Sequence, residues 1–180
     1  MELRTKGTQA FCLLLCLAGF SGAAISAVQG HGLVNMQGAI IDTACAIATE
    51  SREQIIDVQI MPMLDIAREG KGKKIPFRIE LINCVLERQN KELPDWRHFQ
   101  VTFDGNTDGE MFSTVGEASG ISLVISDASG NIARPGLPLP AVNIQPGSMT
   151  LNYSITLTAN QQPLKAGSYF SSVRFKMDYY

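Results

Sequence analysis

The most regular alternation of apolar and polar residues lies in residues 167–180, GSYFSSVRFKMDYY. The odd positions carry mostly apolar side chains, which are Tyr169, Val173, Phe175, Met177 and Tyr179, and the even positions 174, 176 and 178 are charged. Successive side chains point to opposite faces of a strand, so this pattern predicts a strand with one apolar and one charged face. A terminal strand this apolar is expected to dock onto a sheet, because chain ends otherwise fray.

Further segments with period-two alternation predict the rest of a β-sheet protein. The clearest are residues 74–84, 98–105, 120–128 and 149–159, with weaker ones at 38–47, 54–60 and around Val142 and Ile144. Residues 68–74 are expected to form a solvated loop, and residues 86–96 a polar connection with a single helical turn. No segment of ten or more residues has a helical apolar period. Short strands separated by turn signals indicate an antiparallel sandwich.

Residues 28–37 (VQGHGLVNMQ) form a shorter alternating segment ahead of the first cysteine-bearing strand. Its even positions are Val28, Gly30, Gly32, Val34 and Met36. This stripe is too narrow to fold alone. It is either an ordinary first strand of the sandwich or an arm that pairs with a different molecule. The two glycines weaken a strand and are typical of a close approach by another backbone.

Residues 1–27 have the organisation of an export signal. Arg4 and Lys6 supply positive charge, residues 10–20 are apolar, and small residues follow up to position 27. The apolar run is too short to span a bilayer comfortably. Cleavage is expected after Ala24 or Ala27.

Removal of this signal leaves the cysteine pair Cys45 and Cys84. In an exported protein an isolated pair is most simply one disulfide. A metal or redox site would need more ligands or a CxxC spacing, and the sequence has neither. A disulfide over a loop of roughly 40 residues stabilises a fold by about 3–4 kcal/mol in the chain-entropy model.

Composition narrows the class of protein. The chain has 180 residues, 45% of them hydrophobic and 18% charged, with a formal net charge of −2. These values fit one globular domain that is neither disordered nor embedded in a membrane. No basic patch is present, so we do not expect nucleic acid as a partner.

The sequence holds no recognisable catalytic or cofactor motif. Residues 104–110 (DGNTDGE) resemble the start of a calcium loop, but the position of the bidentate glutamate is Val115, so a turn between strands is favoured. His31 and His98 lack neighbours that would suggest metal ligation or nucleophilic catalysis. Trp96 is interpreted as a core or loop anchor rather than a sugar-stacking platform. We therefore expect neither an enzyme nor a metal site.

The two ends of the chain together resemble the subunits of chaperone–usher pili, the type 1 and P-pilus pilin family. That family has a glycine fourteenth from the end, alternating apolar residues and a penultimate tyrosine, and Gly167, Val173, Phe175, Met177 and Tyr179 match them. The segment MQGAIIDTACAI also resembles the family's start, with Gly38 and Cys45 in the matching places. The resemblance covers essentially the whole chain after the export signal.

This resemblance implies an all-β, incomplete immunoglobulin-like sandwich over residues 38–180 that lacks its last strand. Residues 28–37 would be a donor-strand arm, with Val28, Gly30, Gly32, Val34 and Met36 as its donor face. The strand from Gly167 with Val173, Phe175, Met177 and Tyr179 would border an acceptor groove, and basic chaperone residues would hold the Tyr180 carboxylate. The implied partners are a periplasmic chaperone, an outer-membrane usher and neighbouring pilins, on the way to a cell-surface fimbria involved in adhesion.

The chain is predicted to be a minor subunit of the fibre rather than its main shaft subunit. The chain is too short for the second domain of a tip adhesin. The segments QIIDVQ, VTFDG, SGNIARPG and LKAGSYF resemble the subunit that terminates and anchors P-type pili, whose groove takes no donor strand. The alternative class is an exported β-sandwich binding module, for example for carbohydrate, which would fold alone and show a cluster of surface aromatic residues.

Overall fold

The computed structural model describes residues 32–38, 40–58 and 60–180. It divides into two units, residues 1–40 and 41–180. Within the first unit, residues 32–38 and 40 have no regular secondary structure. The predicted export signal, His31, and the donor positions Val28 and Gly30 lie outside the described residues. In the described part of the chain no helix is long and apolar enough to cross a membrane.

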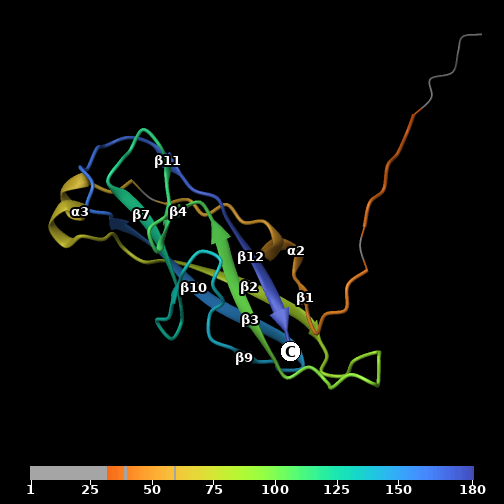
Figure 1. Ribbon diagram of the computed structural model, residues 1–180. Coiled ribbons are helices and arrows are strands. Elements are labelled where there is room, and N and C mark those ends of the chain that lie inside the picture. Colours follow the sequence, from red (N-terminus) through yellow and green to blue (C-terminus); the bar gives the residue numbers. More distant parts are fainter. Residues whose placement is uncertain (1–31, 39, 59) are drawn as a thin grey trace, which may run out of the picture. The chain divides into compact units, whose positions relative to one another are not determined.

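The second unit is built around a seven-stranded antiparallel sheet (Figure 1). Its strand order is β1-β2-β10-β7-β5-β4, with β8 also paired to β7. The bounds are β1 (Ala46–Ile47), β2 (Ile75–Cys84), β4 (Thr107–Asp108), β5 (Met111–Ser113), β7 (Ile121–Asp127), β8 (Ile132–Ala133) and β10 (Gly147–Ala159). The two longest strands, β2 and β10, pair along most of their length and supply one layer of the core.

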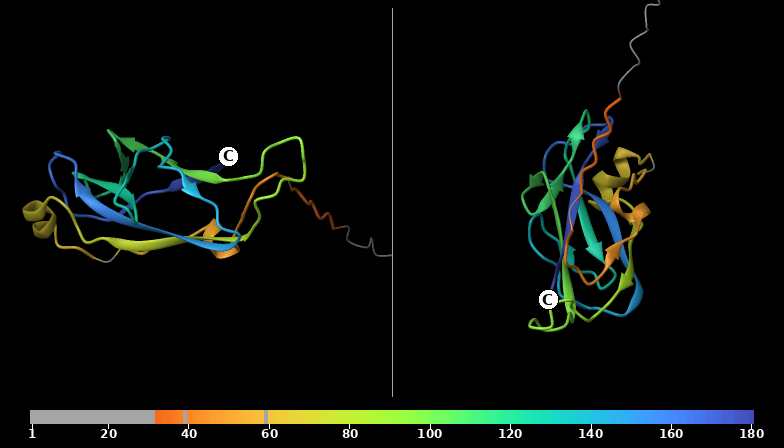
Figure 2. Two further views of the ribbon diagram at one scale, coloured as in Figure 1. Left: turned by 90° about the horizontal axis from the view of Figure 1, so that it is seen from below. Right: turned by 90° about the vertical axis from the view of Figure 1, so that its right-hand side faces the viewer.

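A second layer faces this sheet (Figure 2). It contains β12 (Val173–Tyr179), β3 (His98–Gly105) and β9 (Val142–Asn143), paired in that order. A short ladder of β11 (Tyr169–Phe170) with β6 (Val115–Gly116) stands beside it. These two packed antiparallel sheets confirm the predicted sandwich.

The core fills the space between the two layers. Ile79 and Leu81 from β2, Phe99 from β3 and Phe112 from β5 are fully buried. The i, i+2 spacing of Ile79 and Leu81 follows from the period of a strand, which sends alternate side chains inward. Burial of each such side chain contributes about 1.5–3 kcal/mol, so these residues account for much of the stability of the sandwich.

Two short helices flank the first sheet, α2 (Thr49–Arg52) and α3 (Met63–Glu69). Gly70 caps the C-terminus of α3. Its φ of 71° is left-handed, and its N–H donates to the Ile66 carbonyl at 2.8 Å. The sequence pattern did not predict these helices. They are too short to establish an apolar period, and in α3 only Ile66 is buried.

The structure confirms the strands predicted at 74–84, 98–105, 120–128 and 149–159, and a short one at Val142. Other expectations were wrong. Of the described residues in the range 38–47, only Ala46 and Ile47 form a strand, which follows Cys45 instead of ending at it. Residues 86–96 contain a turn and no helix. Strands β4, β5 and β6 were not predicted, because two or three residues cannot display a period.

The predicted disulfide between Cys45 and Cys84 is present, across a sequence separation of 39. Both cysteines are buried. Next to them the Val85 N–H donates to the Ala44 carbonyl at 2.8 Å. The disulfide therefore fastens the start of the second unit to the end of β2.

Candidate strand-binding groove

Strand β12 uses only one of its two edges. It pairs with β3 in the register Tyr179 opposite Phe99, and one residue further Tyr180 and His98 exchange both backbone hydrogen bonds, at 2.8 and 3.1 Å. Opposite residues in an antiparallel ladder alternate between bonded and non-bonded pairs. The even residues 174, 176 and 178 therefore bond to β3, and the odd residues direct their N–H and C=O groups to the other edge. Among the described residues no strand pairs there.

The odd residues of β12 also carry the apolar side chains. Val173, Phe175, Met177 and Tyr179 pack against the core but stay only half-buried. The even residues Arg174 and Lys176 are exposed and pair with Asp104 at 3.2 Å and Asp178 at 2.9 Å. The two-faced strand predicted from the sequence is confirmed. Its inner face is uncovered on the side where a further strand of the sandwich would lie.

A groove runs along this uncovered side, and its first part is a cavity of about 570 Å³. Ser172, Val173, Arg174 and Phe175 form one wall. The opposite wall is residues 51–56, and core side chains of both layers, among them Phe103 and Ile155, form the floor. Such a cavity is large enough to take several side chains of an added segment.

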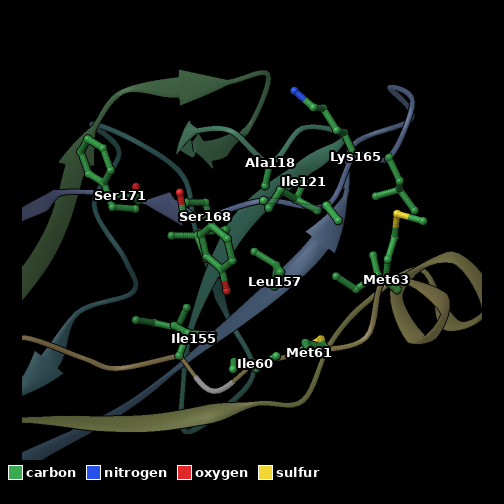
Figure 3. Close-up of a pocket in the computed structure, with 18 of the residues that line it drawn as sticks. Ile60, Met61, Met63, Ala118, Ile121, Ile155, Leu157, Lys165, Ser168 and Ser171 are labelled. Atoms are coloured by element: carbon green, nitrogen blue, oxygen red, sulfur yellow. The ribbon is translucent and has the colours of Figure 1, made fainter.

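A second cavity of about 550 Å³ continues the groove toward α3 (Figure 3). Both cavities share Ile56, Leu123 and Ile155 in their lining. Figure 3 shows Ile155 and Leu157 between Ile60 and Met61 on one side and Ser168 on the other. The two cavities therefore form one apolar channel from Phe175 to α3.

The wall opposite β12 is the segment that the sequence predicted to be a strand at 54–60. Its described residues belong to no helix or strand. Gln54 ties it to β2 through one hydrogen bond from Nε2 to the Arg78 carbonyl at 2.9 Å. Ile56 and Val58 are half-buried, while Ile55 is 97% exposed. The alternation is real, but this segment borders the groove instead of joining a ladder, so the predicted pairing was wrong.

Gly167 lines the second cavity at a point where two backbones meet. A Cβ at this position would lie 2.6 Å from Glu117 Cβ and 2.8 Å from the Ala118 nitrogen. On the next residue, the Ser168 carbonyl accepts hydrogen bonds from the N–H groups of Glu117 and Ala118 at 2.9 and 3.1 Å. The glycine identified from the sequence is thus explained by close packing rather than by an unusual φ.

Replacing Gly167 with alanine is therefore expected to push the 117–118 backbone away and to destabilise the sandwich by about 1–3 kcal/mol. Urea unfolding monitored by far-UV circular dichroism measures this change. Gly130 is the matched control, because a Cβ there would meet nothing within 4 Å, although its φ of 88° makes some strain unavoidable. Equal losses for Gly167→Ala and Gly130→Ala would contradict the packing explanation.

Aromatic side chains pack around Tyr179, the last residue of β12. Trp96 is 7% exposed and meets the Tyr179 ring edge-on at 6.0 Å. The Arg88 guanidinium lies over the Trp96 ring at 3.3 Å from its centroid. Burial raises the pKa of the Tyr179 phenol, whose hydroxyl donates to the Cys45 carbonyl at 3.5 Å. The interpretation of Trp96 as a core anchor is confirmed.

The residues of the rejected calcium loop have other partners. Asp104 pairs with Arg174, and Asp108 accepts hydrogen bonds from Ser122 and Asn160. Asp108 belongs to β4, in a hairpin with β5. Over the described residues no cluster of three His, Cys, Asp or Glu side chains could hold a metal ion.

The predicted donor residues that the structure describes are Gly32, Val34 and Met36. Val34 and Met36 are 86% and 92% exposed. Their role as a donor face stays a prediction, as does the role of β12 as an acceptor. The structure places Val173, Phe175, Met177 and Tyr179 on the inner face of β12, Tyr180 directly after this strand, and Gly167 in the lining of the second cavity. What the sequence did not reveal is that residues 51–58, 60 and 61 form the opposite wall, because only the fold brings them to the groove.

Relatives were found among known proteins, although no protein-family model matches the chain. The PRS fimbrial minor pilin protein of Escherichia coli is 35% identical over 154 residues, covering 84% of this chain and 79% of that protein. The PAP fimbrial minor pilin protein of the same species is 34% identical over the same lengths. The Major MR/P fimbria protein of Proteus mirabilis is 28% identical over 168 residues, or 91% of this chain and 92% of that protein.

Solved structures agree on the fold. The P pilus rod subunit PapA superposes with a TM-score of 0.68 at 18% identity, covering 77% of this chain and 100% of that one. A structure of a chaperone–usher pilus gives a TM-score of 0.67 at 23% identity, covering 87% and 100%. The incomplete immunoglobulin-like sandwich and the sequence identities lead to one conclusion: the chain belongs to the family of fimbrial pilins.

Proposed function

We propose that the protein is a minor structural subunit of a chaperone–usher fimbria, and that its groove is filled by a β-strand from a partner. The free edge of β12 above one apolar channel carries this proposal. Unpaired backbone groups and half-buried apolar side chains belong to the same four residues, Val173, Phe175, Met177 and Tyr179. A single added strand therefore satisfies both, through main-chain hydrogen bonds and alternate side chains that enter the channel.

The energetic reason is the poor burial of the inner face of β12. Covering an apolar side chain completely is worth about 1.5–3 kcal/mol, and part of that gain is missing at each of the four residues. An exposed apolar channel beside an open sheet edge is also prone to aggregation. The subunit is expected to need a partner strand from the moment it folds. A periplasmic chaperone would supply it first, and a neighbouring pilin later, at the outer-membrane usher.

The donor of this subunit would be the arm at residues 28–37. Val28, Gly30, Gly32, Val34 and Met36 share one face of an extended chain, the spacing that alternate pockets require. The disulfide, the family and the export signal predicted from the sequence support a route through the periplasm to a cell-surface fimbria. None of these features calls for a catalytic group or a cofactor, and the proposed role is structural.

Strand exchange tests the proposal. The mature chain is co-expressed with a pilus chaperone from the same source, and the purified complex receives a peptide of a neighbouring pilin's arm. We expect the peptide to displace the chaperone, as measured by size-exclusion chromatography over time. A control peptide with serine at its alternate apolar positions should displace none. A chain that is stable and monomeric without any chaperone would instead be the stand-alone binding module.

A terminating position in the fibre is the second candidate. It rests on the resemblance of segments such as QIIDVQ and LKAGSYF to the subunit that terminates P-type pili. The higher identity to two minor pilins, 34–35%, than to the major fimbria protein, 28%, supports a minor subunit but does not distinguish its position. The same exchange experiment separates the two positions. A terminator would keep its chaperone in the presence of every donor peptide, while its own arm still enters the groove of another pilin.

A further inference from the structure

A small polar cluster lies behind the wall of the groove, outside the residues that line it. One carboxylate oxygen of Asp108, Oδ2, accepts hydrogen bonds from the Ser122 hydroxyl and from Asn160 Nδ2, the latter at 2.6 Å. Asn160 Nδ2 also lies 3.3 Å from Ser122 Oγ. Ser122 is fully buried in β7, and Asp108 and Asn160 are half-buried. The three residues come from β4, β7 and the turn after β10.

This turn leads directly into the wall of the second cavity. The side-chain oxygen of Asn160, Oδ1, accepts a hydrogen bond from the Gln162 N–H at 3.2 Å. The backbone N–H of Asn160 donates to the Gly120 carbonyl at 3.1 Å. Gln161, between Asn160 and Gln162, has a left-handed φ of 68°, which is unusual for a residue other than glycine. The next residues, from Leu164 to Ser171, line the cavity. The conformation of Asn160 therefore sets where this wall begins.

The wall has further attachments, all on the same side. Ser119 and Lys165 exchange backbone hydrogen bonds at 3.1 and 3.2 Å, and Ser119 Oγ donates to the Pro163 carbonyl at 3.1 Å. The 117–120 segment that makes them leads into β7 and Ser122. Ser122 and Asn160 are the two ends of this hydrogen-bond network, and Asp108 joins them by accepting a hydrogen bond from each.

We infer that Asp108 is a positioning residue of the groove, which holds the 160–168 wall at the spacing that an incoming strand requires. This inference rests on the proposed function. The carboxylate serves because one oxygen can accept from two donors, and hydrogen bonds to an ionised acceptor are stronger than neutral ones. The same two bonds lower the pKa of Asp108, so the group is ionised at neutral pH. An asparagine at position 108 would place an NH2 group next to the donors Ser122 and Asn160, where it finds no acceptor.

The test compares Asp108→Asn with the exchanged pair Asp108→Asn/Asn160→Asp, which restores a carboxylate–amide contact with the partners reversed. The matched control is Asp127→Asn. Asp127 likewise accepts hydrogen bonds from the backbone and side chain of an asparagine, Asn131, both at 2.8 Å, but its turn lines no part of the groove. Each variant is purified with its chaperone and then loaded with a fluorescent arm peptide.

Peptide release in the presence of excess unlabelled peptide is the first readout. We expect Asp108→Asn to release it roughly tenfold faster, the equivalent of one strong hydrogen bond, while Asp127→Asn keeps the original rate and the exchanged pair recovers most of it. A purely structural role would lower the thermal stability of Asp108→Asn and leave the release rate unchanged. That outcome, or equal acceleration by Asp127→Asn, overturns the inference.

Amide hydrogen exchange of residues 160–168 in the chaperone complex is the second readout, and it needs no peptide. Faster exchange at Lys165 in Asp108→Asn than in Asp127→Asn is expected, because the Lys165 N–H donates to Ser119 within this network. Unchanged exchange there contradicts the positioning role. If the chain without substitutions takes up no arm peptide, the proposed strand-accepting groove itself is contradicted. That result is distinct from either result on Asp108.

Discussion

Replacing Cys45 and Cys84 together with serine is expected to lower the free energy of unfolding by about 3–4 kcal/mol. Part of this comes from the larger entropy of an unfolded chain without the link over 39 positions. The native state also loses a buried contact, because both cysteines are packed in the core. Since small domains are stable by only about 5–15 kcal/mol, a large share of the total would be lost.

Urea unfolding of the chaperone-free, peptide-filled subunit measures this loss, with the reduced natural chain as a second form. The two should agree if the covalent link itself is responsible. The wall of the groove opposite β12 begins within the loop that the disulfide closes, so peptide release should also accelerate. A double variant as stable as the oxidised chain would show that the backbone contacts around Ala44 and Val85 suffice without the link.

The second large effect is expected at Phe175. Its ring lies 6.2 Å from that of Phe103 and forms part of the groove wall. In Phe175→Asp the carboxylate can reach solvent while the groove is empty, but a bound strand would bury it. An unpaired buried charge costs several kcal/mol, so the affinity for an arm peptide should fall by at least about 100-fold. The free energy of unfolding of the empty subunit should fall by less than the free energy of peptide binding.

Lys176→Ser is the matched control, since the neighbouring side chain lies on the outer face of the same strand and pairs with Asp178. An exposed pair of this kind is worth little, so peptide affinity should change by less than about threefold. Isothermal titration of chaperone-released subunit, or competition with a labelled peptide, gives both values. Equal losses at the two positions would show that the strand itself had been disrupted and that the inner face has no special part in binding.

Much of the fold could be predicted because long strands display their period. Residues 98–105 were predicted to the residue, and 74–84 to within one position. The two- and three-residue strands β4 to β6 and the short helix α3 left no such pattern. Helix α3 and strands β4 to β6 therefore appeared only in the structure, where contacts with the long strands decide them.

The groove was predictable on one side only. Residues 173–179 show their two faces in the sequence, and the same alternation allowed the free edge to be assigned once the register with β3 was known. The opposite wall alternates as well, at Ile56 and Val58, but periodicity cannot tell a paired strand from an unpaired one. The wall segment at 160–168 has no apolar period, because a turn and its hydrogen bonds with Asp108, Gly120 and Ser119 fix its course.

The free edge of β12 and the alternating arm are different surfaces of one molecule, which limits the symmetry of any assembly that joins them. A contact between unlike surfaces is heterologous, and it cannot close into a two-fold dimer as a self-complementary patch would. Copies joined this way form either a ring or an open filament. Since each junction uses one arm and one groove, the filament would be unbranched and polar, with an unfilled groove at one end and an unused arm at the other.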